Sequence, residues 1–318
     1  MDEGDLTFGP VPSRRLGRSL GINNIPPKIC SYSCVYCQVG RTREMRIRRG
    51  EYYPPDALIA AVERRVREAE KAGAPVDALT FVPDGEPTLD VHLGREIAGL
   101  KKQGRRVAVI SNASTIADES VRADLGLADW VSLKVDAVDR EIWRNVDRPH
   151  GRLDLDEILK GIAAFRRAFG GELVTETMLV GGLNDGEESV SAVADFLGEL
   201  KPDRAYLSAP TRPPAESGIH PPDESALQRA YQIVRRRVKT VELLVCYEGD
   251  TFEAVRGSAE EEILGITAVH PMRERAVFAL LDKAGEDRSL LEVMIRRCAL
   301  ARVEYEGETY YLRRFLKR

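Results

Sequence analysis

Apolar positions along the chain follow two alternating spacings. Short apolar runs such as Ala78–Val82 are typical of buried strands, whereas Leu155, Ile158, Ile162 and Phe165 return every three or four positions, as on one face of a helix. The other strand candidates are residues 20–25, 107–111, 130–135, 173–180, 205–208 and 241–246. Helical stretches are expected near residues 54–73, 92–104, 116–126, 154–169, 186–200 and 222–237.

A strand followed by a helix, repeated about six times, predicts right-handed crossovers and a parallel sheet with helices outside. Residues 8–20 are rich in Gly, Pro and Arg, and we expect them to form an irregular lead-in to the first strand. Sheets of this kind place their chemistry at the carboxyl ends of the strands.

Polar segments follow successive predicted strands at those carboxyl ends. Each alone has a plain structural explanation as a turn, a helix N-cap, an exposed pair or a tight loop. Because all of them follow strands of one sheet, we expect them to meet at one rim and form a site. They are the cysteine loop of residues 30–37, Gly85-Glu86-Pro87, Ser111-Asn112, Lys134 with Asp136, and residues 181–185.

Three clustered cysteines, Cys30, Cys34 and Cys37, carry the most specific chemistry in the sequence. Thiolates bind iron–sulfur clusters and zinc, which usually take four protein ligands. Here the fourth ligand is missing locally, so three irons of a [4Fe–4S] cube would be held and one left open. Two other interpretations stay open: buried core thiols on one helix face, or a zinc site completed from a distance. Cys246 and Cys298 are expected to be core thiols.

The spacing Cys30-x3-Cys34-x2-Cys37 resembles the cluster motif of the radical S-adenosylmethionine (SAM) superfamily. Gly85-Glu86-Pro87 resembles the segment whose backbone binds the SAM amino group in that family, with Asp84 where the motif has its first glycine. The resemblance covers roughly residues 8–245. It implies a partial (β/α)6 radical SAM barrel and a [4Fe–4S] cluster that reductively cleaves SAM to a 5′-deoxyadenosyl radical.

The same resemblance implies which residues contact the cluster and SAM. It identifies no catalytic residue that acts on the substrate. The cysteines would bind the metal, and residues 178–181 would flank the adenine. A reductant such as ferredoxin or flavodoxin is implied as a partner. The implied SAM-binding residues are Tyr36, Gly85, Glu86, Pro87, Ser111, Asn112, Lys134 and Asp136.

The segments around residues 8–21 and 37–42 are similar to a subgroup often placed with the tRNA enzymes of wybutosine synthesis. Those enzymes carry extra cysteines for a second cluster before the motif, and this chain has none before Cys30. A pyruvate-condensing reaction is therefore not expected. As the substrate, tRNA or a protein fits the resemblance.

Composition limits the classes of protein that this chain can belong to. The 318 residues suggest one large domain, residues 1–250, and a small one, residues 251–318. A net charge of −4 argues against a globally basic nucleic-acid binder. The absence of an 18-residue apolar run and of a signal peptide, together with clustered cysteines, predicts a cytoplasmic protein that does not enter membranes.

The final residues show helices followed by two alternating strands around Glu306-Gly307, which suggests a winged-helix-like domain. Such a unit can place a helix in a nucleic-acid groove, but the candidate helix here is largely apolar, and winged helices also serve as protein–protein or packing modules. The arginines that would suit phosphates are Arg296, Arg297, Arg313 and Arg314.

Two arginine-bearing segments before that domain are candidates for substrate contact. The proline-rich residues 209–222 should form a loop, either a lid that contacts substrate through Arg212 and His220 or a passive connection. Near the N-terminus, a group of arginines could bind an anion or pair with surface carboxylates. These are Arg14, Arg15 and Arg18.

The leading hypothesis is therefore a radical SAM enzyme that acts on tRNA or another macromolecule. An activase of a glycyl-radical enzyme is the alternative within the same class. From a different class, the chain could be a non-catalytic, metal-binding winged-helix regulator.

Overall fold

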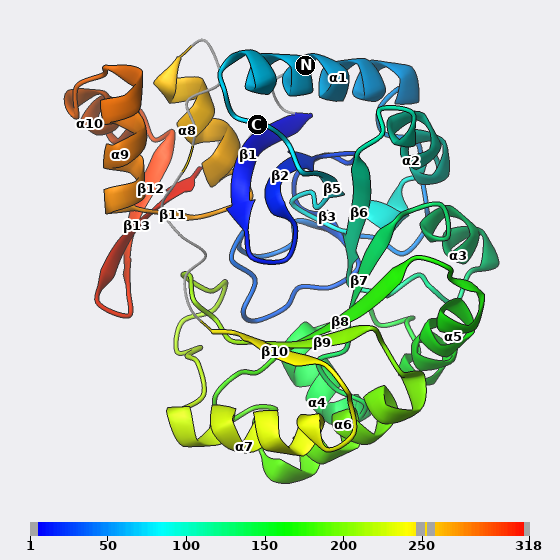
Figure 1. Cartoon of the computed structure of the whole chain (residues 1–318). Coiled ribbons are helices and arrows are strands. Elements are labelled where there is room, and N and C mark those ends of the chain that lie inside the picture. Colours follow the sequence, from blue (N-terminus) through cyan, green and yellow to red (C-terminus); the bar gives the residue numbers. More distant parts are fainter. Residues whose placement is uncertain (1–5, 246–251, 253–257, 315–318) are drawn as a thin grey trace.

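The main body is one curled sheet of eight strands in the order β1-β2-β5-β6-β7-β8-β9-β10 (Figure 1). The computed structural model describes residues 6–245, 252 and 258–314. Neighbouring strands from β2 to β10 are parallel, and β1 is antiparallel to β2. This confirms the partial (β/α)6 barrel. The strands are β1 Thr7–Ser13, β2 Gly17–Ile22, β5 Ala78–Phe81, β6 Arg106–Ser111, β7 Trp130–Lys134, β8 Glu172–Met178, β9 Arg204–Ser208 and β10 Val241–Leu244.

Helices lie along the outer side of the curled sheet (Figure 1). All six helices predicted between the strands are present, with ends within about three residues of the expected ones. In α5 the predicted apolar stripe, including Leu155, Ile158, Ile162 and Phe165, is buried. The helices are α1 Pro55–Lys71, α2 Leu93–Lys101, α3 Glu119–Leu125, α5 Leu155–Ala168, α6 Glu187–Leu200 and α7 Glu224–Arg235.

The inner face of the sheet changes from apolar to polar along its strands. A small buried cluster lies on this face, mostly in the first half or the middle of the strands, with Leu244 at the end of β10: Leu16, Ala78, Ala108, Trp130, Val174, Tyr206 and Leu244. Farther along the same strands, the same alternation presents Lys134, Glu176 and Ser208 to a cavity, because every second residue of a strand faces the same side. The charged and hydroxyl side chains of β7, β8 and β9 that face the cavity thereby lie in the second half of each strand.

The local structure differs from the prediction in two places. Residues 8–20 are not irregular, since they form most of the β1–β2 hairpin; β1 is an edge strand, where prolines such as Pro10 and Pro12 are tolerated. Helix α4, Arg140–Asp147, was not predicted. Its start is fixed by Asp139, which accepts hydrogen bonds from the backbone N–H groups of Glu141 and Ile142.

The described C-terminal residues, 258–314, form three helices and a three-stranded antiparallel sheet, in the order β11-β13-β12. The expected helices and hairpin are present, while the winged-helix assignment stays a prediction. The boundary expected between residues 250 and 251 lies outside the described residues. We call residues 258–314 the C-terminal unit. Its elements are α8 Ala259–Thr267, β11 Met272–Arg273, α9 Glu274–Ala284, α10 Ser289–Arg296, β12 Leu300–Tyr305 and β13 Glu308–Arg313.

The structure describes one of the two cysteines outside the cysteine loop, and its exposure differs from the prediction. Cys298 is exposed rather than a core thiol, because it lies in the turn between α10 and β12 with a positive φ of 58°. Cys246 lies outside the described residues.

The C-terminal unit packs against the N-terminal edge of the barrel (Figure 1). Phe8 and Val11 of β1 belong to the same buried apolar cluster as Ile263, Ile266 and Met272. Beside it, the Arg65 guanidinium of α1 donates to both carboxylate oxygens of Glu262 in α8 at 2.7 Å and to the Gly9 carbonyl oxygen. The side chains of Arg65 and Glu262 are only 3% and 1% exposed. Barrel and C-terminal unit therefore share a core and a buried ion pair.

Candidate active site

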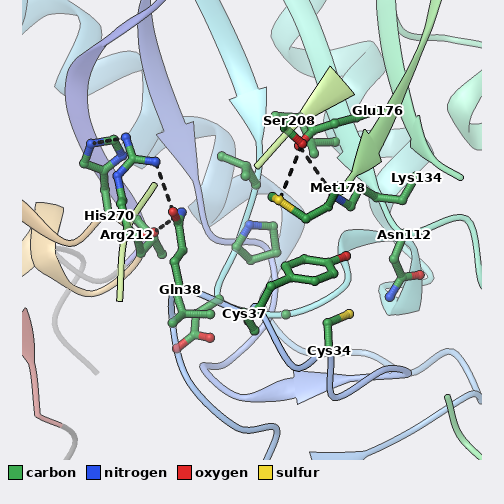
Figure 2. A pocket seen from close by; sticks show the side chains of 18 of the residues that line it. Cys34, Cys37, Gln38, Asn112, Lys134, Glu176, Met178, Ser208, Arg212 and His270 are labelled. Carbon is green, nitrogen blue, oxygen red and sulfur yellow. Dashed lines mark hydrogen bonds and ion pairs between the residues drawn. The ribbon is translucent and has the colours of Figure 1, made fainter. Parts of the chain in front are cut away.

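A cavity of about 350 Å³ lies at the carboxyl ends of the strands (Figure 2). It is lined by the cysteine loop, by the ends of several strands, by residues 209–212, and by Val269 and His270 of the C-terminal unit. Four of the five polar segments predicted from the sequence reach this cavity. The fifth, residues 181–185, lies behind it, where the Asn184 amide donates to the carbonyl oxygens of Asp136 and Met178 at 2.9 Å.

The three cysteines lie on a loop held at both sides. The loop begins at the end of β3, Ile29–Cys30, which pairs with β4, Glu44–Met45. On its other side, Ser33 N–H donates to the Asp147 carbonyl oxygen at 3.1 Å and Val35 N–H to that of Val146 at 2.9 Å, both at the end of α4. Because the loop is not helical, the interpretation as core thiols on one helix face is wrong.

All three thiols are half-buried and line the cavity. Burial raises the pKa of Cys30 to about 12, with a further contribution from Glu86, and burial also raises the pKa values of Cys34 and Cys37. Thiolate is the form that binds metal, so metal binding here would release protons. In the described part of the chain, no three His, Cys, Asp or Glu side chains are arranged to hold one metal ion.

Glu86 organises the ends of β5 and β6 rather than facing the cavity as a free carboxylate. It is 1% exposed and accepts hydrogen bonds from the hydroxyls of Thr88 and Ser111 and the backbone N–H groups of Thr88 and Asn112, at 2.6 to 3.1 Å. Burial raises the pKa of Glu86 above its ordinary value, although these donors act in the opposite direction. Asn112, fixed in this way, extends its amide to within 3.5 Å of Cys30 Sγ.

The segment before Glu86 lies against the cysteine loop. Asp84 Oδ2 lies 3.1 Å from Lys28 Nζ, and both side chains are more than 90% buried. Burial raises the pKa of Asp84 to about 6, although Lys28 lowers it. The residue that replaces the first glycine of the family motif is therefore the partner of a lysine that precedes the cysteines.

A second polar group lies on β7, β8 and β9. Glu176 contacts Arg15, lies 3.4 Å from Lys134 Nζ, and accepts a hydrogen bond of 3.0 Å from the Ser208 hydroxyl. Burial alone would raise the pKa of Glu176, but Lys134, Arg15 and Ser208 lower it to about 2. Lys134 Nζ also lies 4.9 Å from the centre of the Tyr36 ring. Glu176 is therefore a carboxylate that holds two cations at the cavity wall.

Two of the predicted SAM-binding residues do not line the cavity. Pro87 begins the short 3-10 helix η2, Pro87–Leu89, and is buried. Asp136 lies behind Tyr36, whose hydroxyl donates to it, and accepts the Met178 backbone N–H at 2.7 Å. The other six, Tyr36, Gly85, Glu86, Ser111, Asn112 and Lys134, do line it. Their contact with SAM stays a prediction.

Sequence patterns did not single out Glu176, Gln38 or His270 in the cavity wall, nor Asp147 beside it. Glu176 is a charged residue within the buried strand Glu172–Met178, and it faces inward. A charge at such a position is the feature of the sequence that could have indicated a site residue. Asp147 accepts a contact of 3.3 Å from Cys34 Sγ, and burial followed by Asp136 raises its pKa well above the ordinary value. Nothing in the sequence indicates His270 as a site residue, and Gln38 stands out only as part of the segment of residues 37–42.

The candidate arginines separate into two groups. Arg14, Arg15 and Arg212 line the cavity, whereas Arg18 pairs with Asp77 on the surface, both about half-exposed. His220 is exposed and outside the cavity lining, where its carbonyl oxygen accepts the Gly181 N–H. The proline-rich loop thus contributes its first residues to the site and not its histidine.

A family model described as the radical SAM superfamily matches residues 24–197, which is more than half of the chain and includes the cysteine loop. The chain belongs to the radical SAM superfamily. The similarity to one relative, UPF0026 protein MJ1312 of Methanocaldococcus jannaschii, extends further, with 44% identity over 98% of this chain and 97% of that protein. A UPF0026 protein of Helicobacter pylori is 35% identical over 65% of this chain and 67% of that protein.

Solved structures show the same fold. A radical SAM methyltransferase from Sphaerobacter thermophilus superposes with a TM-score of 0.53 at 16% identity, over 71% of this chain and 66% of that one. SuiB of Streptococcus suis, solved with S-adenosylmethionine, gives 0.53 at 17% identity over 71% and 50%. Membership of the radical SAM superfamily indicates an enzyme of this class, which uses an iron–sulfur cluster, SAM and a reductant. Among the described residues, no helix is long and apolar enough to span a membrane.

Proposed function

We propose that this protein binds a [4Fe–4S] cluster through Cys30, Cys34 and Cys37 and reductively cleaves SAM in the adjoining cavity. The observation that carries the proposal is that three half-buried thiols on one loop line the same cavity as the polar ends of the strands. Such a cluster, when bound, supplies the electron that converts SAM to a 5′-deoxyadenosyl radical. Three protein thiolates would leave the fourth iron for SAM.

The residues of the chain would orient the cofactors and exclude water. Glu86 fixes the backbone of Asn112, whose amide donates toward Cys30 Sγ and Ser31 Oγ. On the opposite strands, Glu176 holds Lys134 beside the Tyr36 ring, which limits the positions that an adenine could occupy. The buried apolar cluster around Trp130, two members of which, Leu16 and Leu244, also line the cavity, would keep bulk water from that side.

The substrate is proposed at the level of a class, namely tRNA or another macromolecule, with ferredoxin or flavodoxin as the reductant. Two of the four arginines expected to bind phosphate do not strengthen the case for tRNA, because Arg296 lies 3.5 Å from Glu292 and Arg297 contacts Glu260. No observation on the described residues favours an activase of a glycyl-radical enzyme over this proposal.

The test is anaerobic reconstitution with iron and sulfide, reduction with dithionite, addition of SAM, and detection of 5′-deoxyadenosine by mass spectrometry. We expect about four irons per chain and 5′-deoxyadenosine from the intact protein. A variant with Cys30, Cys34 and Cys37 all changed to Ala should give neither. The matched control is Cys298→Ala, which removes an exposed thiol outside the cavity and should retain both. A protein that holds the cluster yet cleaves no SAM would overturn the proposal.

A further inference from the structure

We propose that an acidic electron-carrier protein docks on an arginine-rich surface beside the cysteine loop, outside the cavity, and reduces the cluster from there. The inference rests on the proposed function, because it takes Cys30, Cys34 and Cys37 as the ligands of a cluster that must be reduced. It goes further by placing the reductant on particular residues of this chain. The surface is made by residues 41–48 and 148–152.

Both of these segments hydrogen-bond to the backbone of the cysteine loop. In the first segment, the Arg46 N–H donates to the Cys30 carbonyl oxygen at 2.9 Å. In the second, the His150 N–H donates to the Ser31 carbonyl oxygen, also at 2.9 Å. Because consecutive carbonyl groups of the loop are used in this way, the two segments lie on its two sides. A protein bound to them comes close to the proposed cluster ligands without entering the cavity.

A carboxylate of the proline-rich loop joins the two segments into one surface. Glu216 accepts hydrogen bonds from Arg41 Nη2 and Arg148 Nη1, each at 2.7 Å, and its N–H donates to the Val35 carbonyl oxygen at 3.1 Å. The segments hold six arginines against two carboxylates, Glu44 and Glu216, which leaves an excess of four positive charges in a chain of net charge −4. We call the six exposed arginines the arginine surface: Arg41, Arg43, Arg46, Arg48, Arg148 and Arg152.

The composition of the arginine surface fits a protein partner better than a merely solvated face. All of its basic residues are arginines, and protein interfaces are enriched in arginine and methionine and depleted of lysine. Met45 lies between these arginines in the sequence and is 36% exposed, so it offers an apolar contact. The partner that complements an excess of positive charge is an acidic protein.

The position of the arginine surface favours an electron donor over the substrate. None of its six arginines is among the described residues that line the cavity. A substrate must bring its reacting atom into the cavity, whereas an electron donor only has to come close to the cluster, since electron transfer slows steeply with distance. In this step the donor is oxidised by one electron and the cluster is reduced by one, and no bond forms or breaks.

Two double variants with the same change in net charge test the proposal. The surface variant, Arg48→Glu with Arg152→Glu, reverses one charge in each segment. Neither side chain forms an ion pair with a described residue, so the fold should be kept. The distant variant, Arg67→Glu with Arg236→Glu, reverses two exposed arginines on α1 and at the end of α7.

An acidic flavodoxin is the probe for docking. Its oxidised form is titrated calorimetrically into the cluster-loaded and the cluster-free full-length protein. Its reduced form is mixed with the oxidised, cluster-loaded protein, and reduction of the cluster is followed by freeze-quench EPR. Dithionite replaces flavodoxin in a parallel reaction, because a small reductant does not need a docking surface.

We expect the surface variant to bind flavodoxin at least about tenfold more weakly than the intact protein and to be reduced by it correspondingly more slowly, since attraction between opposite charges raises association rates by about 10 to 1,000-fold. The distant variant should behave like the intact protein. Dithionite should reduce all three equally. Raising the ionic strength from about 0.01 to 0.15 M should weaken binding by the intact protein more than by the surface variant, because the Debye length falls from about 30 to 8 Å.

Equal binding and reduction of the intact protein and the surface variant, or no binding of flavodoxin by the intact protein, would overturn the proposal. A titration with bulk tRNA tests the other polyanion. If the surface variant loses affinity for tRNA while its reduction by flavodoxin is unchanged, the arginine surface binds RNA and the proposal is wrong.

Should the surface variant not fold, Arg48→Gln with Arg152→Gln takes its place. This variant removes the two charges without reversing them, so it should show a smaller loss in the same direction. Failure of the proposed function is recognised separately, by the absence of 5′-deoxyadenosine from the intact protein with dithionite as the reductant.

Discussion

Gly85 lies where the strand-end segment meets the backbone of the cysteine loop. A Cβ built at this residue would lie 2.0 Å from the Ile29 carbonyl oxygen and 2.7 Å from Ile25 Cδ1. The nearer atom belongs to the backbone and cannot turn away. Only glycine therefore allows the Glu86 N–H to reach the Ile29 carbonyl oxygen at 3.2 Å, just before the first cysteine.

For this reason Gly85→Ala should lower the free energy of unfolding by about 1–3 kcal/mol or more, as overpacking of a tight site does. The measurement is urea unfolding followed by circular dichroism, with iron content after reconstitution as a second readout. Gly170→Ala is the matched control, because its Cβ would meet no atom within 4 Å. Equal stabilities for the two variants would contradict the close approach.

At this scale the sequence predicted the residue types better than their roles. The cysteines and the strand-end segments could be assigned because each follows a strand of one parallel sheet. The role of Glu86 as an acceptor for Ser111 and Asn112 could not, since its donors come from another strand. In the sequence, Asp84 stands out only as a departure from the family motif. Its role as an ion-pair partner depends on Lys28, 56 residues earlier.

Helix α4 is the element that holds the cysteine loop from the side. Its last residues, Val146 and Asp147, accept the backbone N–H groups of Val35 and Ser33. Its first turn depends on Asp139, which accepts the N–H groups of Glu141 and Ile142 at 2.8 and 2.9 Å. A helix of only eight residues has little stability of its own, so its cap matters for the loop.

We therefore expect Asp139→Ala to destabilise the protein by about 0.5–2 kcal/mol, the usual cost of a lost N-cap. It should also increase hydrogen exchange in residues 140–147 and in the cysteine loop, and reduce iron retention. Asp118→Ala is the comparison: Asp118 caps α3 by accepting the Ser120 N–H at 2.8 Å. Its cost in stability should be similar, but exchange in the cysteine loop should not change. Unchanged exchange there in Asp139→Ala would refute the coupling.

Elements with strong periodicity were the ones that could be predicted. The apolar stripe of α5 and the apolar run of β5 can be recognised in the sequence, whereas α4 is short and lacks a long apolar stripe. The β1–β2 hairpin could not be predicted, because Pro10 and Pro12 suggest irregular structure. Only the sheet order shows that β1 is an edge strand, where prolines are tolerated.

On the scale of the whole molecule, the Arg65–Glu262 ion pair joins barrel and C-terminal unit in a place that water does not reach. Without Glu262, the buried Arg65 guanidinium keeps, of the described carboxylates, only the more distant one of Glu68, at 3.8 Å, so Glu262→Leu should cost about 3–5 kcal/mol in the free energy of unfolding. The measurement is equilibrium unfolding in guanidinium chloride.

The double variant Arg65→Met with Glu262→Leu provides the control. Because it removes both charges and keeps apolar volume, it should recover most of the lost stability. A double variant as unstable as the single one would show that the shape of the pair, and not its charge, holds the two parts together. Neither this ion pair nor the position of His270 in the cavity could be predicted, since each joins residues nearly 60 or more apart in the sequence.

The packing of β1 also has a consequence during synthesis on the ribosome. Phe8 and Val11 leave the ribosome some 250 residues before their apolar partners Ile263, Ile266 and Met272. At a translation rate of about 5–20 residues per second, the outer side of β1 stays uncovered for about 10 to 50 seconds. An exposed edge strand is a site for unwanted pairing, so the nascent chain depends on protection of its first hairpin until the last helices arrive.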